Sequence, residues 1–300
     1  AFPSKPVRIV VPYPPGGPVD ALARPLADGL SKLWGGNAVL IENRPGANAI
    51  IGTDYVAKAP ADGHTLILAN DPSLSSNQYL YSKLPYDPVK DFAPVAGVAS
   101  TTLILLIPPS LPVANFPELV SAAKAKPGTL SYGSIGPGSV THLDAEAMAT
   151  AAGIQLVHVP YKGTGEVVPA LLNGQINMAL SAIGPSLGLI RQGKLKAIGI
   201  AAAERSKLLP DVPTFNESGL RFEARSWFAI AAPAKTPRPI IDKIAADVRK
   251  VVDTPEYTDK FIVGMGLDPF PLGPDAFAKY LEQDRAKYAE RVKNANVRLD

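Results

Sequence analysis

The feature that most constrains this chain is a recurring order of short apolar run, glycine-rich turn and amphipathic helix. Its first copy passes from the β-branched stretch 7–11 through the turn 13–20 to leucines at helical spacing that begin at Leu22. The apolar run is typical of a buried strand, and Pro18 suits the first turn of the helix that follows. Pro25 is expected to kink this helix or to delay its start. The recurring order predicts an α/β fold, with a mostly parallel sheet flanked by helices in each lobe.

The same order continues along the chain until its last quarter, where only helices are expected. Further strands are predicted at residues 38–42, 65–69, 101–107, 130–133, 155–159, 176–181, 197–201 and 225–231. Further helices are predicted at 52–59, 116–125, 167–172, 185–191, 239–252, 255–263 and 274–292, with one more that ends at 152. Because the last three helices have no strand to pair with locally, we expect them to pack back on the first lobe.

Two lobes are therefore predicted, and the first of them is discontinuous. The first lobe is expected to comprise residues 1–100 plus 226–300, and the second residues 101–225. Hinge strands near 100–103 and 225–228 would join the lobes, which is a geometry that permits closure around a ligand.

A second glycine-rich turn, at residues 133–142, matches the first in its place between a strand end and a helix start. Helix N-termini expose unpaired N–H groups and attract anions, and glycine lets a ligand approach the backbone. One such turn alone is more often a simple capped turn, but two of them, one in each lobe, favour a shared anion site. Neither turn contains Lys or Arg, so neutral donors are expected: the N–H groups of Gly16, Gly17, Val19, Ser139 and Val140, and the Thr141 hydroxyl.

Several classes of function are disfavoured by composition and motif. The net charge of +3, from 30 basic and 27 acidic residues, is too small to indicate a nucleic-acid partner. The chain has no cysteine, which excludes disulfides and thiolate sites. Its longest apolar run, 103–107, is far shorter than the ~20 residues that span a bilayer. Neither turn has the Gly-Lys-Ser/Thr ending of a phosphate-binding loop, and no cofactor is expected.

Three alternatives for individual residues stay open. The segment 132–136 resembles the nucleophile elbow of a hydrolase, although Tyr132 stands where that motif has glycine, so a cleft hydrolase using Ser139 or Ser134 is the alternative function. No credible base is expected beside either serine, because His142, although close to Ser139 in sequence, would diverge from it on the same helical turn. His142 and Glu146, four residues apart, could hold a metal, but such a pair is usually solvated, and we expect no metal site and no catalysis. Lys162 or Arg24 could form an ionic clamp on an anion.

Motifs along nearly the whole chain resemble the Bug/TctC family, the substrate-binding proteins of tripartite tricarboxylate transporters. The matching segments are 5–17 (KPVRIVVPYPPGG), 42–47 (ENRPGA), 84–92 (LPYDPVKDF), 132–134 (YGS), 158–163 (HVPYKG) and 209–214 (LPDVPT). The resemblance implies a periplasmic type II solute-binding fold of the Venus-flytrap kind. It also implies capture of a small carboxylate-bearing solute, such as an amino acid, a dicarboxylate or an aromatic acid such as nicotinate, in the interlobe cleft. Val19 departs from the family, which often has a hydroxyl residue before the aspartate.

The resemblance also implies site residues, partners and location. The residues expected at the ligand are Tyr13, Pro15, Gly16, Gly17, Val19, Asp20, Asn70, Ser134, Gly136, Gly138, Ser139, Val140, Thr141, Tyr161, Ala182 and Trp227. For two of these residues a structural role is the alternative to ligand binding: Asn70 could simply form a turn, and Trp227 could simply belong to the core. We expect a monomer that serves transporter subunits or a sensor kinase. The start Ala1-Phe2-Pro3 is what a cleaved secretory leader would leave, so a periplasmic location is expected.

Overall fold

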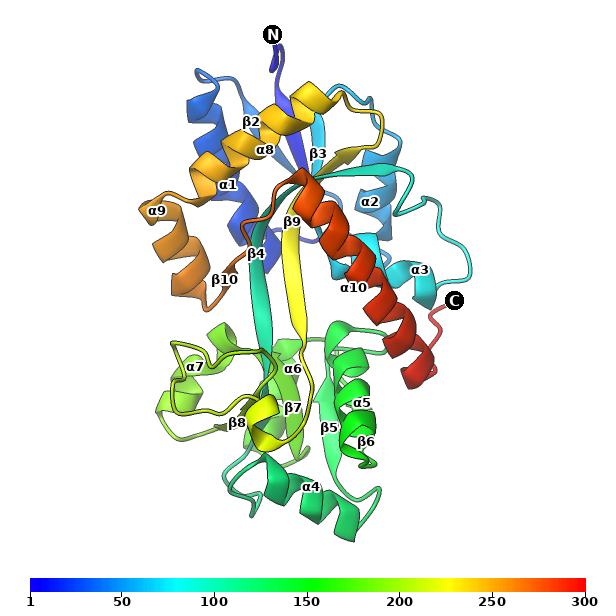
Figure 1. Ribbon diagram of the computed structural model, residues 1–300, viewed down its shortest axis with the longest axis vertical. Helices are drawn as coiled ribbons and strands as arrows, with labels where there is room; N and C mark the ends of the chain where they lie inside the picture. Colours follow the sequence, from blue (N-terminus) through cyan, green and yellow to red (C-terminus); the bar gives the residue numbers. More distant parts are fainter. The chain divides into compact units, whose positions relative to one another are not determined.

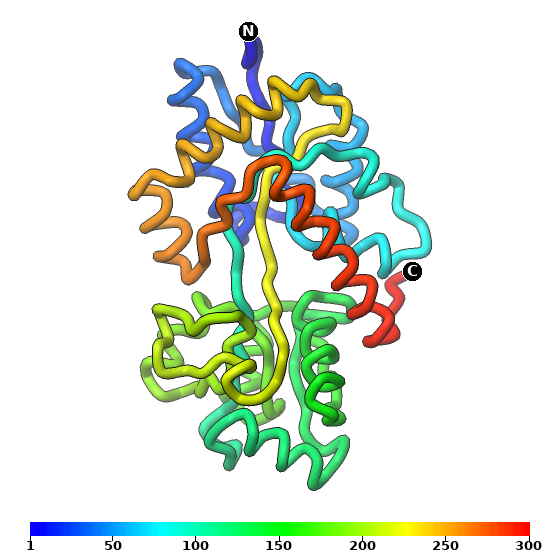
Figure 2. Tube along the Cα trace, in the orientation of Figure 1, coloured from blue at the N-terminus to red at the C-terminus, as the bar shows by residue number.

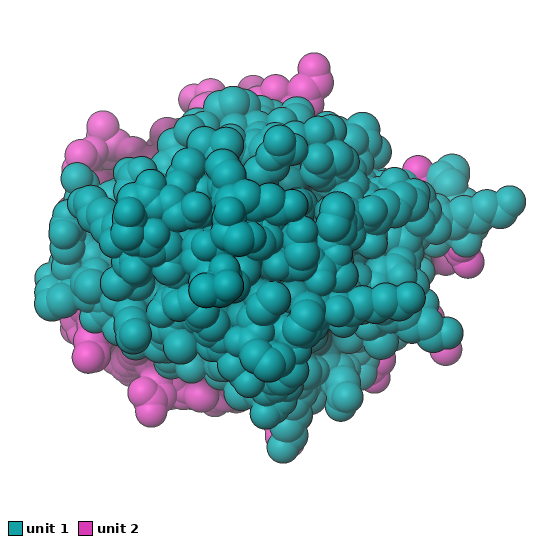
Figure 3. Space-filling model, turned by 90° about the horizontal axis from the view of Figure 1, so that it is seen from above, with its two compact units in different colours: residues 1–100, 227–289, 300 teal, residues 101–226, 290–299 magenta.

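The computed structural model describes residues 1–300, which divide into two compact units. Unit 1 contains residues 1–100, 227–289 and 300, and unit 2 contains 101–226 and 290–299 (Figure 3). The expected first region, 1–100 plus 226–300, differs from unit 1 mainly at the end of the chain. The difference arises because Arg291 pairs with the buried carboxylate of Asp144 and also donates to the carbonyl of Glu223 at 2.7 Å, which groups residues 290–299 with unit 2.

Unit 1 is built from both ends of the chain, as the blue, cyan and orange parts of the trace show (Figure 2). Its strands are β1 (Val7–Val11), β2 (Val39–Asn43), β3 (Thr65–Asn70), the first part of β4 (Phe92–Ile107), most of β9 (Arg225–Pro233) and β10 (Asp268–Pro269). Its helices are α1 (Pro18–Leu33), α2 (Ile50–Ala57), α3 (Asn77–Leu80), α8 (Arg238–Val252), α9 (Pro255–Tyr257) and most of α10 (Pro274–Ala295), with π-helical turns at Pro72–Ser76 and Thr258–Ile262.

The sheet of unit 1 is covered on both faces, as alternation along its strands requires. In β1, Ile9 packs among residues of α1 and α8, whereas Val10 packs among residues of α2 and α10. These helices are seen beside the sheet in Figure 1. β1 pairs in parallel with β2 and β3, so the carboxyl ends of these strands, and the loops that follow them, lie at one edge.

Unit 2 repeats this arrangement with the inserted part of the chain. Its strands are the second part of β4, β5 (Ser131–Ser134), β6 (Val157–Pro160), β7 (Met178–Ala182) and β8 (Lys196–Ile200). Its helices are α4 (Phe116–Ala125), α5 (Val140–Ala152), α6 (Thr164–Leu172) and α7 (Ile183–Arg191). Along β4, Leu105 packs with residues of α4 and α5, whereas Leu106 packs with residues of α6 and α7.

The sheets are mixed rather than almost wholly parallel. The β-loop-α repeats give parallel pairs, β1 with β2 and β3, and β5 with β6 and β7. The long strands break the pattern, since β9 runs antiparallel to β3, and β4 runs antiparallel to β7, β8 and β10. No helix is long and apolar enough to cross a membrane.

Two local expectations, for α1 and for the last quarter of the chain, are corrected in part. Pro25 lies inside α1, which begins at Pro18, so the start of the helix is not delayed, whereas the alternative of a kink stays a prediction. The helical last quarter contains the short strand β10, which pairs with Ser100 and Ala99 of β4. The Cβ of any larger residue at Gly97 would collide with the Phe270 carbonyl, so this pairing depends on the glycine of β4.

Candidate functional site

The first glycine-rich turn, residues 13–20 between β1 and α1, is held by a single buried carboxylate. We call this segment loop 1. Asp20 is 4% exposed and accepts hydrogen bonds from the Gly16 N–H at 3.0 Å, from Arg24 Nε at 2.8 Å and from Asn43 Nδ2 at 3.0 Å. Burial opposes ionisation of Asp20, but the bonds from Arg24, Asn43 and Gly16 outweigh it and lower the pKa of the carboxyl group. The charge of Asp20 therefore shapes loop 1.

A second set of contacts ties loop 1 to the end of β3. The Tyr13 hydroxyl donates to Asn70 Oδ1 at 2.9 Å, and Asn43 Nδ2 donates to the Tyr13 carbonyl at 3.1 Å. Burial raises the pKa of Tyr13, so its hydroxyl stays a donor. With its oxygen engaged, Asn70 turns its amide nitrogen away from Tyr13, and that nitrogen donates to no protein atom. Asn70 thus positions Tyr13 and keeps a free donor.

The free backbone donors of loop 1 are fewer than the sequence indicated. The prediction for Gly16 was wrong, because its N–H already binds Asp20. Gly16 has φ +88°, a conformation that favours glycine. Pro18 at the first helical position has no N–H. The N–H groups of Gly17 and Val19 donate to no protein atom, as expected at the start of a helix.

The second glycine-rich turn, residues 134–142 between β5 and α5, is held by neutral side chains. We call this segment loop 2. The Ile135 N–H donates to Thr141 Oγ1 at 3.1 Å, and the Gly136 N–H donates to Ser134 Oγ at 3.1 Å. Gly136 has φ +128° and Gly138 has φ +76°, so glycine is required at both places by backbone conformation. No charged group takes part in these contacts.

Ser139 and Thr141 both take part in contacts inside loop 2, and the Ser139 N–H, one of the predicted donors, is already engaged there. The Ser139 N–H donates to the Gly136 carbonyl at 3.2 Å, and Ser139 Oγ caps α5 by accepting the His142 N–H. Thr141 Oγ1 accepts from Ile135 and lies 3.2 Å from Ser139 Oγ. The N–H groups of Val140 and Thr141 are the ones that donate to no protein atom.

Two histidines contact the backbone or side chains of loop 2: His142 is its last residue, and His158 lies on β6. The Gly138 N–H donates to His142 Nδ1 at 3.0 Å, and His158 Nε2 lies 2.6 Å from Ser134 Oγ. The expectation that no base lies beside Ser134 was therefore wrong. A signal was present, because β5 and β6 are parallel with Tyr132 opposite His158, so residues of the two segments face one another.

The serine–histidine contact lies in the interior of unit 2. Ser134 is only 1% exposed, and its Oγ already accepts the Gly136 N–H. Ser139 serves as the cap of α5. The two side chains that were considered as metal ligands are already hydrogen-bonded within the protein. His142 Nδ1 accepts from the Gly138 N–H, and Glu146 accepts from the Tyr132 hydroxyl.

The remaining predicted residues have different surroundings. Pro15 is exposed at the tip of loop 1. The Tyr161 N–H donates to the Ser134 carbonyl at 2.9 Å, which places Tyr161 beside the start of loop 2, and half-buried Ala182 is the N-cap of α7. Trp227 was predicted at the ligand, but its side chain is fully buried in the core of unit 1 and donates to Asp284 at 2.8 Å. Trp227 is therefore a core residue.

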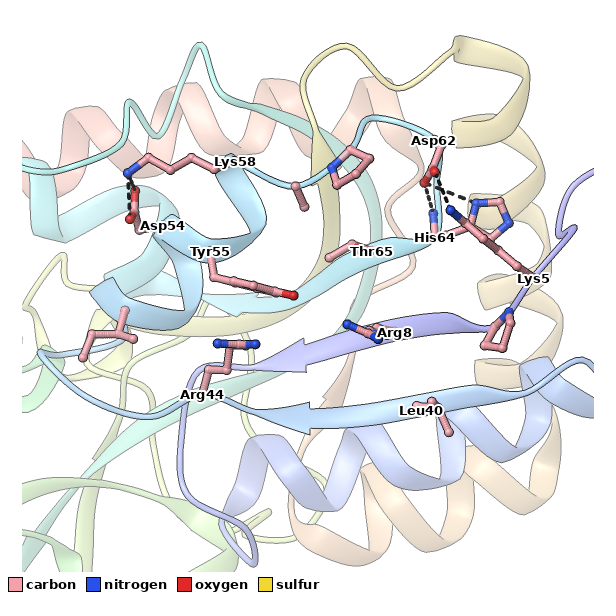
Figure 4. A pocket seen from close by; sticks show the side chains of 14 residues that line it. Lys5, Arg8, Leu40, Arg44, Asp54, Tyr55, Lys58, Asp62, His64 and Thr65 are labelled. Atoms are coloured by element: carbon pink, nitrogen blue, oxygen red, sulfur yellow. Dashed lines mark hydrogen bonds and ion pairs between the residues drawn. The ribbon is translucent and has the colours of Figure 1, made fainter.

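A cavity of about 800 Å³ on unit 1 is separate from both loops. Its cations are already engaged, since Lys58 binds Asp54 at 2.7 Å and the Arg44 guanidinium lies 3.6 Å from the Tyr55 ring centre (Figure 4). The cavity is lined by residues 5, 6, 8, 40, 44, 51, 54, 55, 58–60, 62, 64 and 65. None of the predicted ligand residues lines it.

Solved structures define the class to which this architecture belongs. The periplasmic binding protein BugD is 31% identical with a TM-score of 0.80, and each chain covers 99% of the other. An R. palustris protein with adipate is 32% identical with a TM-score of 0.85 and 99% coverage of both chains. MatC from Rhodopseudomonas palustris with bound malate is 32% identical with a TM-score of 0.80, covering 97% of this chain and 100% of its own. The fold is that of the periplasmic binding proteins.

The sequence assigns the chain more narrowly within that class. The sequence model of TctC, the tripartite tricarboxylate transporter family receptor, matches residues 22–297. The chain belongs to this family, which is a class of solute-binding proteins and which the motifs of the sequence had indicated.

Proposed function

We propose that this protein is a periplasmic receptor that binds a small organic carboxylate, either for uptake by a tripartite tricarboxylate-type transporter or for sensing. The observation that carries the proposal is that loops 1 and 2 each end at a helix whose first N–H groups have no protein partner. Gly17 and Val19 supply these groups in loop 1, and Val140 and Thr141 supply them in loop 2. Such groups are suited to carboxylate oxygens.

The magnitude of these interactions is sufficient for capture of a solute. A hydrogen bond to a charged group contributes about 1.5–3 kcal/mol net, so three or four of them support a dissociation constant on the order of micromolar. Adipate and malate, the ligands of the similar R. palustris proteins, are both dicarboxylates. We therefore place dicarboxylates first among the candidate ligands. That loops 1 and 2 close over one solute stays a prediction.

A thermal-shift screen followed by isothermal titration calorimetry tests the proposal. The panel contains malate, adipate, amino acids and aromatic acids including nicotinate, each with its uncharged amide as a matched control. We expect at least one carboxylate to raise the melting temperature and its amide to have no effect, because an amide lacks the negative charge that helix N-termini attract. Equal stabilisation by acid and amide would contradict the proposal.

The contact of Ser134 with His158 favours hydrolysis as a second candidate function. We expect the solute to be returned unchanged, since Ser134 is buried and its oxygen is engaged by loop 2. Incubation with ester and amide substrates, followed by mass spectrometry, distinguishes the two functions. Turnover that disappears in Ser134→Ala would support the hydrolase.

A further inference from the structure

Two stacked imidazoles lie under loop 2 and have no place in the contacts proposed for the solute. The rings of His142, on α5, and His158, on β6, are 3.9 Å apart between centres and nearly parallel at 7°. On β5, Tyr132 stacks on His158 with centres 5.0 Å apart. The tyrosine hydroxyl donates to Glu146, which lies one helical turn after His142. The stack is thus fixed by three elements of unit 2.

Each imidazole is connected to a glycine of loop 2. His142 Nδ1 accepts the Gly138 N–H, so this nitrogen carries no proton. His158 contacts Ser134 Oγ, which in turn accepts the Gly136 N–H. Gly136 and Gly138 are the two residues of loop 2 with positive φ. The imidazoles therefore stabilise a backbone conformation that residues other than glycine rarely adopt.

We propose that His142 and His158 are positioning residues for carboxylate binding: as neutral imidazoles they keep loop 2 in the form that leaves the N–H groups of Val140 and Thr141 free, and a proton on His142 releases Gly138 and weakens binding. This inference rests on the proposed function and adds a regulation to the same site. The ligand would be held at neutral pH and released on acidification.

The chemistry of the stack explains why protonation is disruptive. A protonated Nδ1 is a donor and cannot accept the Gly138 N–H, which would be left without its partner in a buried segment. Two imidazolium rings at 3.9 Å would also repel each other. Burial lowers the pKa of His142, and burial together with His142 lowers the pKa of His158 to about 4, although Glu146 acts in the opposite direction. Both rings are therefore neutral at neutral pH.

The first test needs no ligand. Nuclear magnetic resonance of the labelled wild-type protein follows the imidazole nitrogens of His142 and the Gly138 amide as the pH falls from about 7 to about 4. We expect the Gly138 amide to shift with the same midpoint as His142, below the ordinary value of 6.5. A Gly138 amide that does not respond when His142 titrates would overturn the inference whether or not a solute has been found.

The second test uses a carboxylate that passes the screen, with adipate as the first probe. His142→Asn places a neutral amide oxygen where Nδ1 accepts, and it cannot be protonated. We expect it to bind within about threefold of the wild type at pH 7, and His142→Ala to bind at least about tenfold more weakly, the loss of one buried hydrogen bond. From pH 7 to pH 4 the wild type should lose at least about threefold more affinity than His142→Asn. Protonation of adipate affects both proteins equally, so it cancels when the two losses of affinity are compared.

His64→Gln in unit 1 is the matched control, because His64 accepts from the Ser4 N–H, far from loop 2 in sequence. It should keep both the affinity and the pH profile of the wild type. An identical pH profile for wild type and His142→Asn would overturn the inference while the proposed function stands. Absence of binding by the wild type to every carboxylate would instead contradict the proposed function.

Discussion

Loops 1 and 2 occupy equivalent places in their units, between a parallel strand and a helix, yet they are held by opposite kinds of chemistry. In loop 1, one buried carboxylate, Asp20, gathers the Gly16 N–H, Asn43 and Arg24. In loop 2, hydroxyl and imidazole groups of Ser134, Thr141 and His142 accept backbone N–H groups, and no ionised side chain takes part. Either an ionic or a neutral set of contacts can therefore hold a loop in the conformation that leaves the first N–H groups of the following helix without a protein partner.

The difference predicts how each loop responds to acid. Asp20 has a lowered pKa, so the ionic contacts of loop 1 persist at pH values where an ordinary carboxyl group is already protonated. The contacts of loop 2 need a neutral imidazole, which is available only above the pKa of His142. Loop 1 should therefore be the acid-resistant loop, and loop 2 the acid-sensitive one.

The largest effect is expected when the centre of loop 1 is removed. Asp20→Ala leaves the Gly16 N–H, the Asn43 amide and the Arg24 guanidinium without their acceptor, at a cost of about 3 kcal/mol or more. Urea unfolding at neutral pH measures this loss of stability, and calorimetry measures the accompanying loss of ligand affinity. Asp20→Asn retains the shape without the charge and should cost less.

If Asp20→Asn were as stable as the wild type, the contacts of loop 1 would owe nothing to ionisation, and the contrast with loop 2 would disappear. Asp28→Asn on the same helix is the control, since Asp28 is exposed and forms no ion pair. It should change the free energy of unfolding by less than about 0.5 kcal/mol.

The next effect concerns the backbone of loop 2. Gly136→Val requires a β-branched residue at φ +128°, which costs about 1–3 kcal/mol and should weaken carboxylate binding by about tenfold or more. The position itself has room, because the nearest atom to an added Cβ is 3.7 Å away. Backbone conformation alone is therefore enough to disfavour the substitution, without a collision with protein atoms.

Gly163→Ala provides the matched control for this substitution. Gly163 lies in the same unit and also precedes a helix, but its φ of 177° is accessible to any residue and an added Cβ meets nothing within 4 Å. Calorimetry should find the affinity of Gly163→Ala within about twofold of the wild type. A similar loss in both variants would show that the effect of Gly136→Val does not depend on the positive φ at that position.

The order of the fold was readable from sequence because each element carries a local signal. The apolar run of β1 and the capping residue Asn115 of α4 are examples, and both elements lie where they were predicted. The first part of β4 was missed because the sequence Phe92 to Ser100 contains alanine, glycine and proline, which are weak strand formers. Pairing with other strands, including β10, makes it a strand.

The candidate site was readable only where its chemistry is local. The unpaired N–H groups of Val19 and Val140 follow from the position of a helix start, and the sequence indicated both. That the carboxylate of Asp20 turns inward depends on Asn43, which lies 23 residues away on β2. The contact between Ser134 and His158 depends on the register of two parallel strands, and no spacing within one segment reveals it.

A smaller effect separates the two loops by pH. In unfolded protein His142 and His158 bind protons with a pKa near 6.5, whereas in the folded protein both pKa values are lower, that of His158 about 4. The unfolded state therefore binds more protons between about pH 6.5 and 4. The stability is fully present above this window and falls as the pH falls through it. Asp20 also has a lowered pKa, so its contribution is present above 3.8 and is lost at still lower pH.

Urea unfolding between pH 7 and pH 5 should show a decline of about 1 kcal/mol that depends on these histidines, a figure reduced for their partial exposure. The double variant His142→Asn with His158→Gln removes both titrating groups and should show a flatter profile in this range. A double variant with an unchanged profile would place the acid sensitivity outside loop 2.

The smallest effect is expected at Lys162, one of the two cations that the sequence offered as an ionic clamp. Its side chain is exposed and follows Tyr161, which contacts loop 2 through its N–H. Arg24, the corresponding cation near loop 1, is already bound to Asp20.

If backbone donors hold the carboxylate, Lys162→Ala should change the affinity by less than about threefold, because exposed charges contribute about 0–1 kcal/mol. Calorimetric titration at low and raised salt measures this, since an exposed ionic contact weakens with salt whereas buried backbone donors respond little. Loss of binding in Lys162→Ala, with binding retained in Gly136→Val, would show that an ionic contact rather than neutral backbone donors holds the carboxylate in unit 2. The contrast between loops 1 and 2 would then disappear.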